Sequence, residues 1–233
     1  MEKRTIITTP VDFDKSDFLS LLSLSAGAAI ARQNAFGAVI GSDGWNVNPM
    51  HGMIKFGERE FPCGIIGTES EIGGTWLWGW AHTESGLPEN ASAPSRRAKR
   101  TLGYCAEFTT AKFELDELHN GHNLSMVTVC AAEKNACYYR CPYDGGALFV
   151  QVNELPDEIF APMLLDVLVK QFMEVLGAFY CDHKLLAAGM LYMNGYNFNV
   201  EPNRITAEKN GLLLNIAFEQ AGGLYRTTNI SLG

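Results

Sequence analysis

The chain has 233 residues, of which 47% are hydrophobic and 19% are charged, and its formal net charge is -8. This composition excludes a disordered chain, and the length suits one large globular domain or two small fused ones. The acidic balance argues against nucleic acid as a partner, because most of the surface would repel phosphate groups.

The first part of the chain predicts one helix followed by four strands. Asp14 or Ser16 can cap the helix, which we expect to run to about Asn34. Short segments typical of strands follow, with glycine, proline and asparagine in the turns between them. Their predicted ranges are 45–48, 53–56, 61–68 and 75–82. We interpret these four segments as an antiparallel meander.

The middle of the chain is expected to be mostly helical. The predicted helices are 93–107, 111–119 and 123–135. Residues 136–141 and 147–152 flank a turn that contains two glycines, and they predict a hairpin. The first predicted helix carries a basic cluster, which we interpret as a solvated face. The cluster consists of Arg96, Arg97, Lys99 and Arg100.

The last part predicts a helical stretch and a second meander. The helical stretch covers about 161–190, and a break near Gly177 is left open. Asn210-Gly211 lies between two apolar runs, and both residue types accept the left-handed angles of a type I′ hairpin turn. The predicted strands of this meander are 196–200, 204–208, 212–218 and 224–230.

The pattern as a whole predicts an α+β fold in a single compact domain, 1–233. Two antiparallel four-stranded meanders would have helices covering one side of the sheets, with a helical and hairpin insert at 91–156 between them. The meanders resemble each other, which suggests an internal duplication of 14–90 and 157–233. The alternative carries equal weight, because any two aromatic meanders with glycine turns look alike.

Neither a membrane span nor an export signal is expected. The most apolar stretch, 159–181, is interrupted at helical spacing by charged and polar residues, which is typical of an amphipathic core helix. No apolar segment follows the charged first residues. The six cysteines lie among hydrophobic neighbours and are interpreted as reduced thiols. We therefore expect a cytoplasmic protein.

The most informative motif is a run of alternating tryptophans. In an extended strand, alternate side chains share one face, so the run predicts a wall of three indoles ending in a histidine. The residues on this face are Trp76, Trp78, Trp80 and His82. The wall is either core or the floor of a ligand pocket in which Glu69 or His82 orients polar groups. Since most large aromatic residues are buried, the core interpretation is favoured.

A second cluster surrounds Arg140 in the predicted hairpin. A buried arginine needs a carboxylate or carbonyl partner, and Asp144 is near in sequence. If the hairpin lies over the tryptophan wall, Arg140 is the best anion-recognising group of the chain. Otherwise the pair of Arg140 and Asp144 only pins the hairpin.

At these motifs the chain resembles a bacterial family known only as a domain of unknown function. The matching segments are Gly67-Thr68-Glu69-Ser70, Thr75 to His82, and Tyr138 to Gly146, and the resemblance covers about 18–152. His82 stands where the family typically has asparagine, so no role is carried over to that position. The resemblance implies no activity.

No catalytic or metal motif stands out. His119 and His122 are spaced like metal ligands, but Asn120-Gly121 between them indicates a loop and no third ligand is near in sequence. We expect no metal and no cofactor. The favoured function is non-catalytic binding of a small ligand or a protein partner. The alternatives are a hydrolase-type enzyme with a tryptophan-floored pocket, and a purely structural or interaction domain such as an immunity-type protein.

Overall fold

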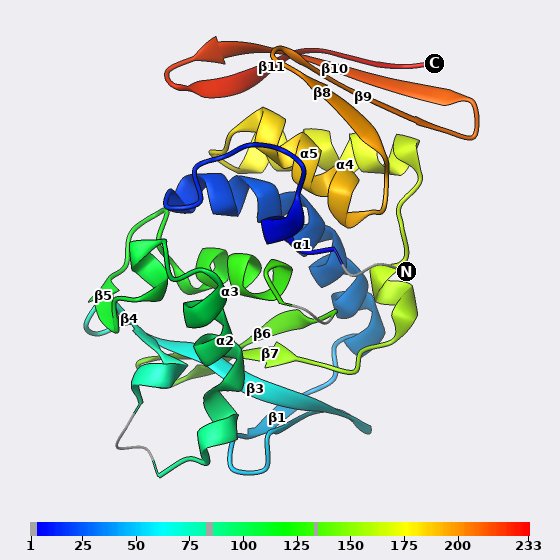
Figure 1. Ribbon diagram of the computed structural model, residues 1–233. Helices are drawn as coiled ribbons and strands as arrows, with labels where there is room; N and C mark the ends of the chain where they lie inside the picture. The colour runs from blue at the N-terminus through cyan, green and yellow to red at the C-terminus, as the bar shows by residue number, and fades with distance from the viewer. Residues whose placement is uncertain (1–3, 83–85, 133–134) are drawn as a thin grey trace. The chain divides into compact units, whose positions relative to one another are not determined.

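The computed structural model describes residues 4–82, 86–132 and 135–233 (Figure 1). The chain forms two compact units. The first unit combines residues 1–31 with 161–233, and the second consists of residues 32–160. Within the described part of the chain, no helix is long and apolar enough to cross a membrane.

Helices and antiparallel sheets occur in both units, so the predicted α+β class is confirmed. The helices are α1 (Phe18–Ile40), α2 (Ala93–Thr101), α3 (Gly121–Cys130), α4 (Leu165–Ala178) and α5 (His183–Met193). The strands are β1 (Trp45–Asn48), β2 (Met53–Phe56), β3 (Arg59–Ser70), β4 (Thr75–Trp78), β5 (Lys112–Glu114), β6 (Cys137–Tyr143), β7 (Gly146–Val152), β8 (Phe198–Glu201), β9 (Arg204–Lys209), β10 (Leu212–Ala221) and β11 (Leu224–Leu232). Short 3-10 helices include η2 (Gly79–Ala81) and η3 (Glu89–Ser92).

The second unit is built on a seven-stranded antiparallel sheet. Neighbouring strands β1, β2, β3 and β4 form the predicted first meander, and β5 adds to its end. The hairpin of β6 and β7 joins the same sheet, because β7 pairs with residues 63–70 of β3. The predicted insert therefore contributes three strands to the first sheet.

Helices cover this sheet on both faces, not on one face as the sequence suggested. α2 and α3 contact β3, and α3 also contacts β6 and β7 (Figure 1). Alternate residues of β6 and β7 point to the other face, where they join the core cluster formed with Phe36 and Ile40 at the end of α1. The side chain of Gln33 donates to the carbonyl of Tyr138 and accepts from its amide, which satisfies part of the β6 edge.

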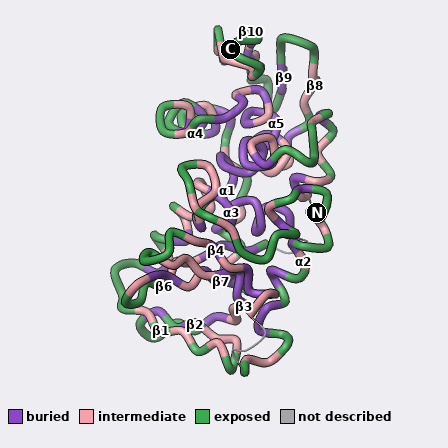
Figure 2. The backbone as a smooth tube through the Cα atoms, turned by 90° about the vertical axis from the view of Figure 1, so that its left-hand side faces the viewer, coloured by how far each residue is buried: buried purple, intermediate pink, exposed green. Residues whose placement is uncertain are grey.

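The first unit packs helices against a four-stranded sheet in the order β11-β10-β9-β8. Leu214, Ile216 and Phe218 of β10 are buried, and α5 contacts both β9 and β11. Most residues of α5 are buried, as the purple tube in Figure 2 shows. Gly189 of α5 faces the backbone carbonyl of Leu24 in α1, so only glycine permits this approach of the two helices.

The second meander has the predicted turn. Asn210 and Gly211 adopt φ angles of 56° and 80°, as a type I′ turn requires, and Lys209 pairs with Leu212 across it. The four-stranded antiparallel arrangement is confirmed.

Several predicted boundaries were wrong. Residues 112–114 form β5, where we expected a helix, because β4 offers them a pairing edge. α1 continues six residues past Asn34 to Ile40, since Phe36 and Ile40 are buried in the second unit. Its first turn is capped by Asp17, which accepts from the Ser20 amide. The open question at Gly177 resolves into two helices, α4 and α5.

The proposed duplication stays a prediction. Each meander follows a helix in the chain, α1 before β1 and α5 before β8. The sequence match paired residues 45–48 with 196–199, whereas β8 covers Phe198–Glu201.

Candidate functional site

The tryptophan run is extended over only half of its length. β4 ends at Trp78, and Gly79–Ala81 form the 3-10 helix η2. A side chain at Gly79 would lie 2.9 Å from the Ile65 carbonyl oxygen and 3.0 Å from Ser95 Oγ, so the chain turns where only glycine fits. The prediction of one extended face from Trp76 to His82 is therefore wrong beyond Trp78.

Trp76 and Trp78 are core residues. Both are 0% exposed, and their ring centroids lie 5.3 Å apart in an edge-to-face arrangement. Trp76 also packs edge-on against Phe149, and Trp78 Nε1 donates to the Glu107 carbonyl at 2.7 Å. Because the protein itself encloses both indoles, they do not form an accessible pocket floor.

Trp80 and His82 leave the face of the other two indoles. The Lys99 ammonium lies 3.4 Å from the centroid of the half-buried Trp80 ring. His82 Nε2 lies 3.1 Å from Thr68 Oγ1. Thr68 lies between the two β3 residues that pair with Trp76 and Trp78, so its side chain points to the opposite face of the sheet. Burial lowers the pKa of His82.

Glu69 and Arg140 lie together, as a combined site would need. Glu69 Oε2 lies 3.8 Å from Arg140 Nε, and Glu69 Oε1 accepts from the Gly121 amide at the start of α3 at 2.6 Å. Arg140 Nη2 also donates to Glu71 Oε1 at 3.0 Å. Arg140 thus pairs with carboxylates of β3 and its flanking turn, whereas the sequence suggested Asp144. The contacts join β3, β6 and α3, and a role in binding a ligand stays a prediction.

His119 lies before α3, whereas His122 lies in the first turn of α3, and the two histidines have different partners. His119 lies between two carboxylates, 2.9 Å from Asp116 and 3.2 Å from Glu107. His122 Nδ1 lies 3.1 Å from the Tyr138 hydroxyl, and burial lowers the pKa of His122. Hydrogen bonding to His119 lowers the pKa of Asp116. In the described residues, no group of three or more His, Cys, Asp or Glu side chains could hold a metal ion.

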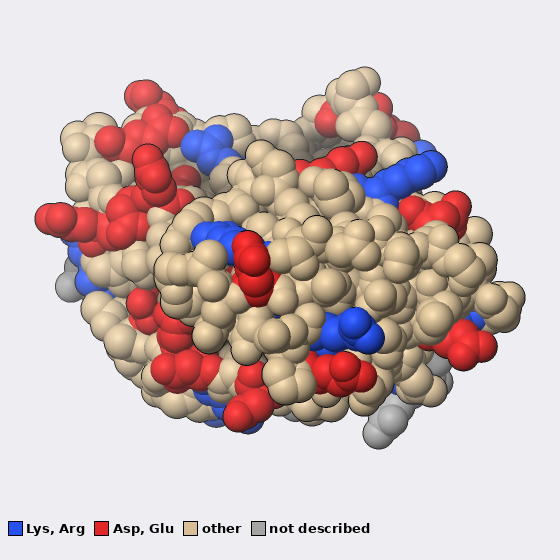
Figure 3. Space-filling view, turned by 90° about the horizontal axis from the view of Figure 1, so that it is seen from above, with Lys and Arg blue, Asp and Glu red and all other residues tan. Residues whose placement is uncertain are grey.

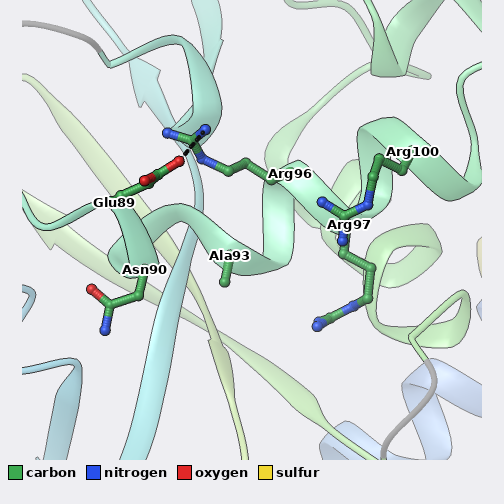
Figure 4. A pocket seen from close by; sticks show the side chains of 6 residues that line it. All are labelled: Glu89, Asn90, Ala93, Arg96, Arg97 and Arg100. Carbon is green, nitrogen blue, oxygen red and sulfur yellow. Dashed lines mark ion pairs between the residues drawn. The ribbon is translucent and has the colours of Figure 1, made fainter.

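A pocket lies along α2. It has a volume of about 540 Å³ and is shown in Figure 4. Its lining residues come from η3 and α2, and they are Glu89, Asn90, Ala93, Arg96, Arg97 and Arg100. Positions 93, 97 and 100 repeat at helical spacing, so one stripe of α2 faces the pocket.

α2 packs against β3 with the side of the helix that does not line the pocket. A side chain at Gly64 would lie 2.7 Å from Pro94, so the missing Cβ lets the helix approach the strand closely. Pro94, Ser95 and Ala98 are buried on that side of the helix. Arg96, Lys99 and Arg100 are exposed, whereas Arg97 is half-buried.

The three arginines of the pocket are held to different degrees. Arg97 Nη2 donates to Gln151 Oε1 at 2.9 Å, and Gln151 is only 2% exposed. Arg96 pairs with Glu89 at 3.2 Å, and the two side chains extend toward each other in Figure 4. Among the described residues, Arg100 forms no ion pair. The pocket therefore presents three guanidinium groups with a single carboxylate, that of Glu89.

A second, smaller pocket adjoins the first and shares Glu89 and Arg96 with it. His82 contributes to its lining, together with Gly79 and Ile65. His82 is thus a predicted site residue that lines a pocket next to the arginine pocket. The basic cluster was visible in the sequence, but η3 was not, and η3 supplies the facing wall.

Comparison with known proteins places the chain in a family. Residues 19–155 match the model of a family of unknown function, DUF6882. The chain belongs to this family. The expected membership in a family without assigned activity is confirmed, and the DUF6882 match includes both pockets beside α2. No curated protein and no solved structure matches the chain.

Proposed function

We propose that this DUF6882 protein binds a small anionic ligand, without catalysis, in the pocket beside α2. The observation that carries the proposal is the convergence of Arg96, Arg97 and Arg100 on one pocket of about 540 Å³. This volume lies in the range of small-molecule sites, about 300–1,000 Å³. The planar guanidinium group matches carboxylate and phosphate geometry with two parallel hydrogen bonds.

The present partners of Arg97 and Arg96 leave both guanidinium groups able to bind an anion. Gln151 holds Arg97, and Gln151 in turn donates to Asn153 Oδ1 at 2.6 Å, so this guanidinium is oriented in advance. The pair of Arg96 and Glu89 is exposed, with side-chain exposures of 43% and 83%. Such surface pairs contribute only about 0–1 kcal/mol, so a bound anion can replace Glu89 as the partner of Arg96.

Net charge favours a small anion over a polyanion. The chain carries a formal net charge of -8, and Asp and Glu side chains are spread over the face seen in Figure 3. A nucleic acid would extend beyond the pocket over a chain of net negative charge, whereas a small ligand stays among the arginines. This argument supports the expectation that nucleic acid is not the partner.

Calorimetric titration with citrate and pyrophosphate tests the proposal. We expect saturable binding that weakens as salt is raised, because ionic strength screens exposed charges. Arg100→Gln should weaken binding about tenfold or more, since a hydrogen bond to a charged group contributes about 1.5–3 kcal/mol. The matched control is Arg59→Gln, which removes an exposed arginine of β3 in the same unit.

Two outcomes would count against the proposal. One is the absence of saturable binding of either anion, which would favour a protein partner instead. The other is equal binding by the wild type and Arg100→Gln. The hydrolase alternative receives less support, because the indoles of Trp76 and Trp78 are enclosed and cannot floor a pocket.

The cysteines support a reducing compartment, which we infer to be the cytoplasm. No disulfide joins the six cysteines, all of which lie in described residues. Burial raises the pKa of Cys63, Cys137 and Cys141 to about 12, so these thiols are protonated and poorly reactive at neutral pH. Thiol titration should find six reduced cysteines in the unfolded chain purified without a reductant from cytoplasmic extract. Recovery of a disulfide would contradict the inference.

A further inference from the structure

A pair of hydrogen-bond donors meets in the first unit, where α5 begins beside β11. His183 Nδ1 lies 3.0 Å from the backbone nitrogen of Thr227, whose N–H points at it. A backbone amide can only donate, and the Arg226 guanidinium, which approaches the other ring nitrogen, has a further acceptor in the Cys181 carbonyl, so we assign Nδ1 as the acceptor. In the neutral imidazole the single ring proton then lies on Nε2.

This tautomer brings two donors together. Arg226 Nη1 lies 3.1 Å from His183 Nε2, and a guanidinium group has no acceptor atom. The Nε2–H and the guanidinium N–H therefore cannot hydrogen-bond to each other. An oxygen acceptor that both groups approach would satisfy them together, and a negatively charged oxygen would do so best.

Burial and the neighbouring Arg226 lower the pKa of His183, which keeps the ring neutral at pH 7. The neutral ring is the form to which the tautomer argument applies. Protonation at lower pH would place a second positive charge beside the guanidinium.

The carboxylate that precedes His183 in the chain is already occupied. Asp182 Oδ1 accepts from the amides of Lys184 and Leu185 at 2.9 Å, and Asp182 Oδ2 accepts from the Tyr225 amide at 2.8 Å. Asp182 is 6% exposed and caps α5 with these bonds. It therefore cannot turn to accept from His183 and Arg226 without leaving backbone amides unpaired.

Arg226 is held in place from two sides. Its Nη1 donates to the Cys181 carbonyl at 2.9 Å, and its guanidinium lies 5.0 Å from the ring centroid of Tyr180. Tyr180 is 67% exposed, so the cluster borders on solvent. His183 and Arg226 are themselves half-buried.

We propose that His183 Nε2–H and the Arg226 guanidinium form a binding site for an oxyanion, namely a carboxylate or phosphate group. The site lies within the first unit and outside the region matched by the family model. It is independent of the arginine pocket beside α2, and either site can fail its test while the other stands.

Nuclear magnetic resonance of the histidine side chains in the full chain tests the tautomer directly. In ¹⁵N-labelled protein at neutral pH, we expect His183 to carry its proton on Nε2. Titration with inorganic phosphate and, separately, with acetate should shift the Nε2 and Arg226 Nε signals saturably. The comparison of the two probes distinguishes a phosphate site from a carboxylate site. A proton found on Nδ1, or unchanged signals with both anions, would overturn the proposal.

Variants separate binding from stability. Arg226→Gln should weaken binding of the responding anion about tenfold or more, because a charged donor is lost. Arg226→Lys should retain part of the affinity, since it keeps the charge but not the planar fork. Arg204→Gln, on an exposed position of β9 in the same unit, is the matched control and should bind like the wild type. Equal affinity of Arg226→Gln and Arg204→Gln, with both folded by circular dichroism, would also overturn it.

Discussion

Trp76 and Trp78, the first two indoles of the tryptophan run, belong to the core of the second unit. Both are fully buried against each other, and Phe149 and Phe108 complete their surroundings. We expect Trp78→Ala to lower the free energy of unfolding by about 3–5 kcal/mol, because it leaves a large cavity in a packed core. Urea denaturation of the full chain measures this loss.

The control for this prediction is Ile72→Ala. Ile72 is 91% exposed, and its truncation should change the free energy of unfolding by less than about 0.5 kcal/mol. If Trp78→Ala were no more costly than Ile72→Ala, the indole would not be part of the core.

His82 predicts a pH dependence of stability. Burial lowers its pKa in the folded chain below the ordinary value of 6.5, so the unfolded chain binds the proton more readily. The stabilisation from neutral His82 is therefore complete above pH 6.5 and is lost as the pH falls through 6.5 toward the lower folded-state pKa.

The His82→Asn variant tests this dependence. Between about pH 8 and pH 5, it should lose less stability than the wild type, because asparagine does not titrate. His51→Asn removes an exposed histidine of the same unit and should lose as much as the wild type. Parallel pH profiles for the wild type and His82→Asn would refute the assignment.

Among the elements, those bounded by local turn chemistry could be predicted from the sequence. β1 and β2 have the predicted bounds, and Asn210-Gly211 forms the predicted turn, because glycine and asparagine determine these positions within a few residues. β5 and η2 were missed because tertiary contacts determine them. β5 depends on pairing with β4, and η2 on the close approach of Ile65 and Ser95 to Gly79.

The contact between α1 and α5 gives a prediction at this scale. An alanine at Gly189 would place its Cβ against the Leu24 carbonyl, and the two helices of the first unit would have to separate. We expect Gly189→Ala to cost about 1–3 kcal/mol of unfolding free energy, as overpacking does. Thermal and urea denaturation both report this change.

Gly177 provides the matched helical control. It lies in α4, and a Cβ there would meet no atom within 4 Å. Gly177→Ala should stabilise the protein by about 0.4–1 kcal/mol, because alanine restricts the unfolded chain and favours the helix. The same sign of effect for both alanine variants would contradict the packing described for Gly189.

For the whole molecule, the sequence pattern predicted the fold class more completely than the candidate functional site. Alternation and turns were enough for two antiparallel sheets joined by helical segments, although not for the three strands that the insert adds to the first sheet. The basic cluster at 96–100 could be recognised in the sequence. Its pocket also requires η3 opposite α2, and no sequence pattern predicts a single 3-10 turn. The His183 and Arg226 cluster joins residues 43 positions apart, which spacing alone does not reveal.

The measurement that tests the central claim most directly is chemical-shift mapping of the ¹⁵N-labelled full chain during a citrate titration. The account predicts saturable shifts of the backbone amides of residues 89–100, which form η3 and most of α2, and a titration midpoint at about tenfold or more higher citrate concentration in Arg100→Gln. Amides of 89–100 that stay unchanged at saturating citrate would contradict it.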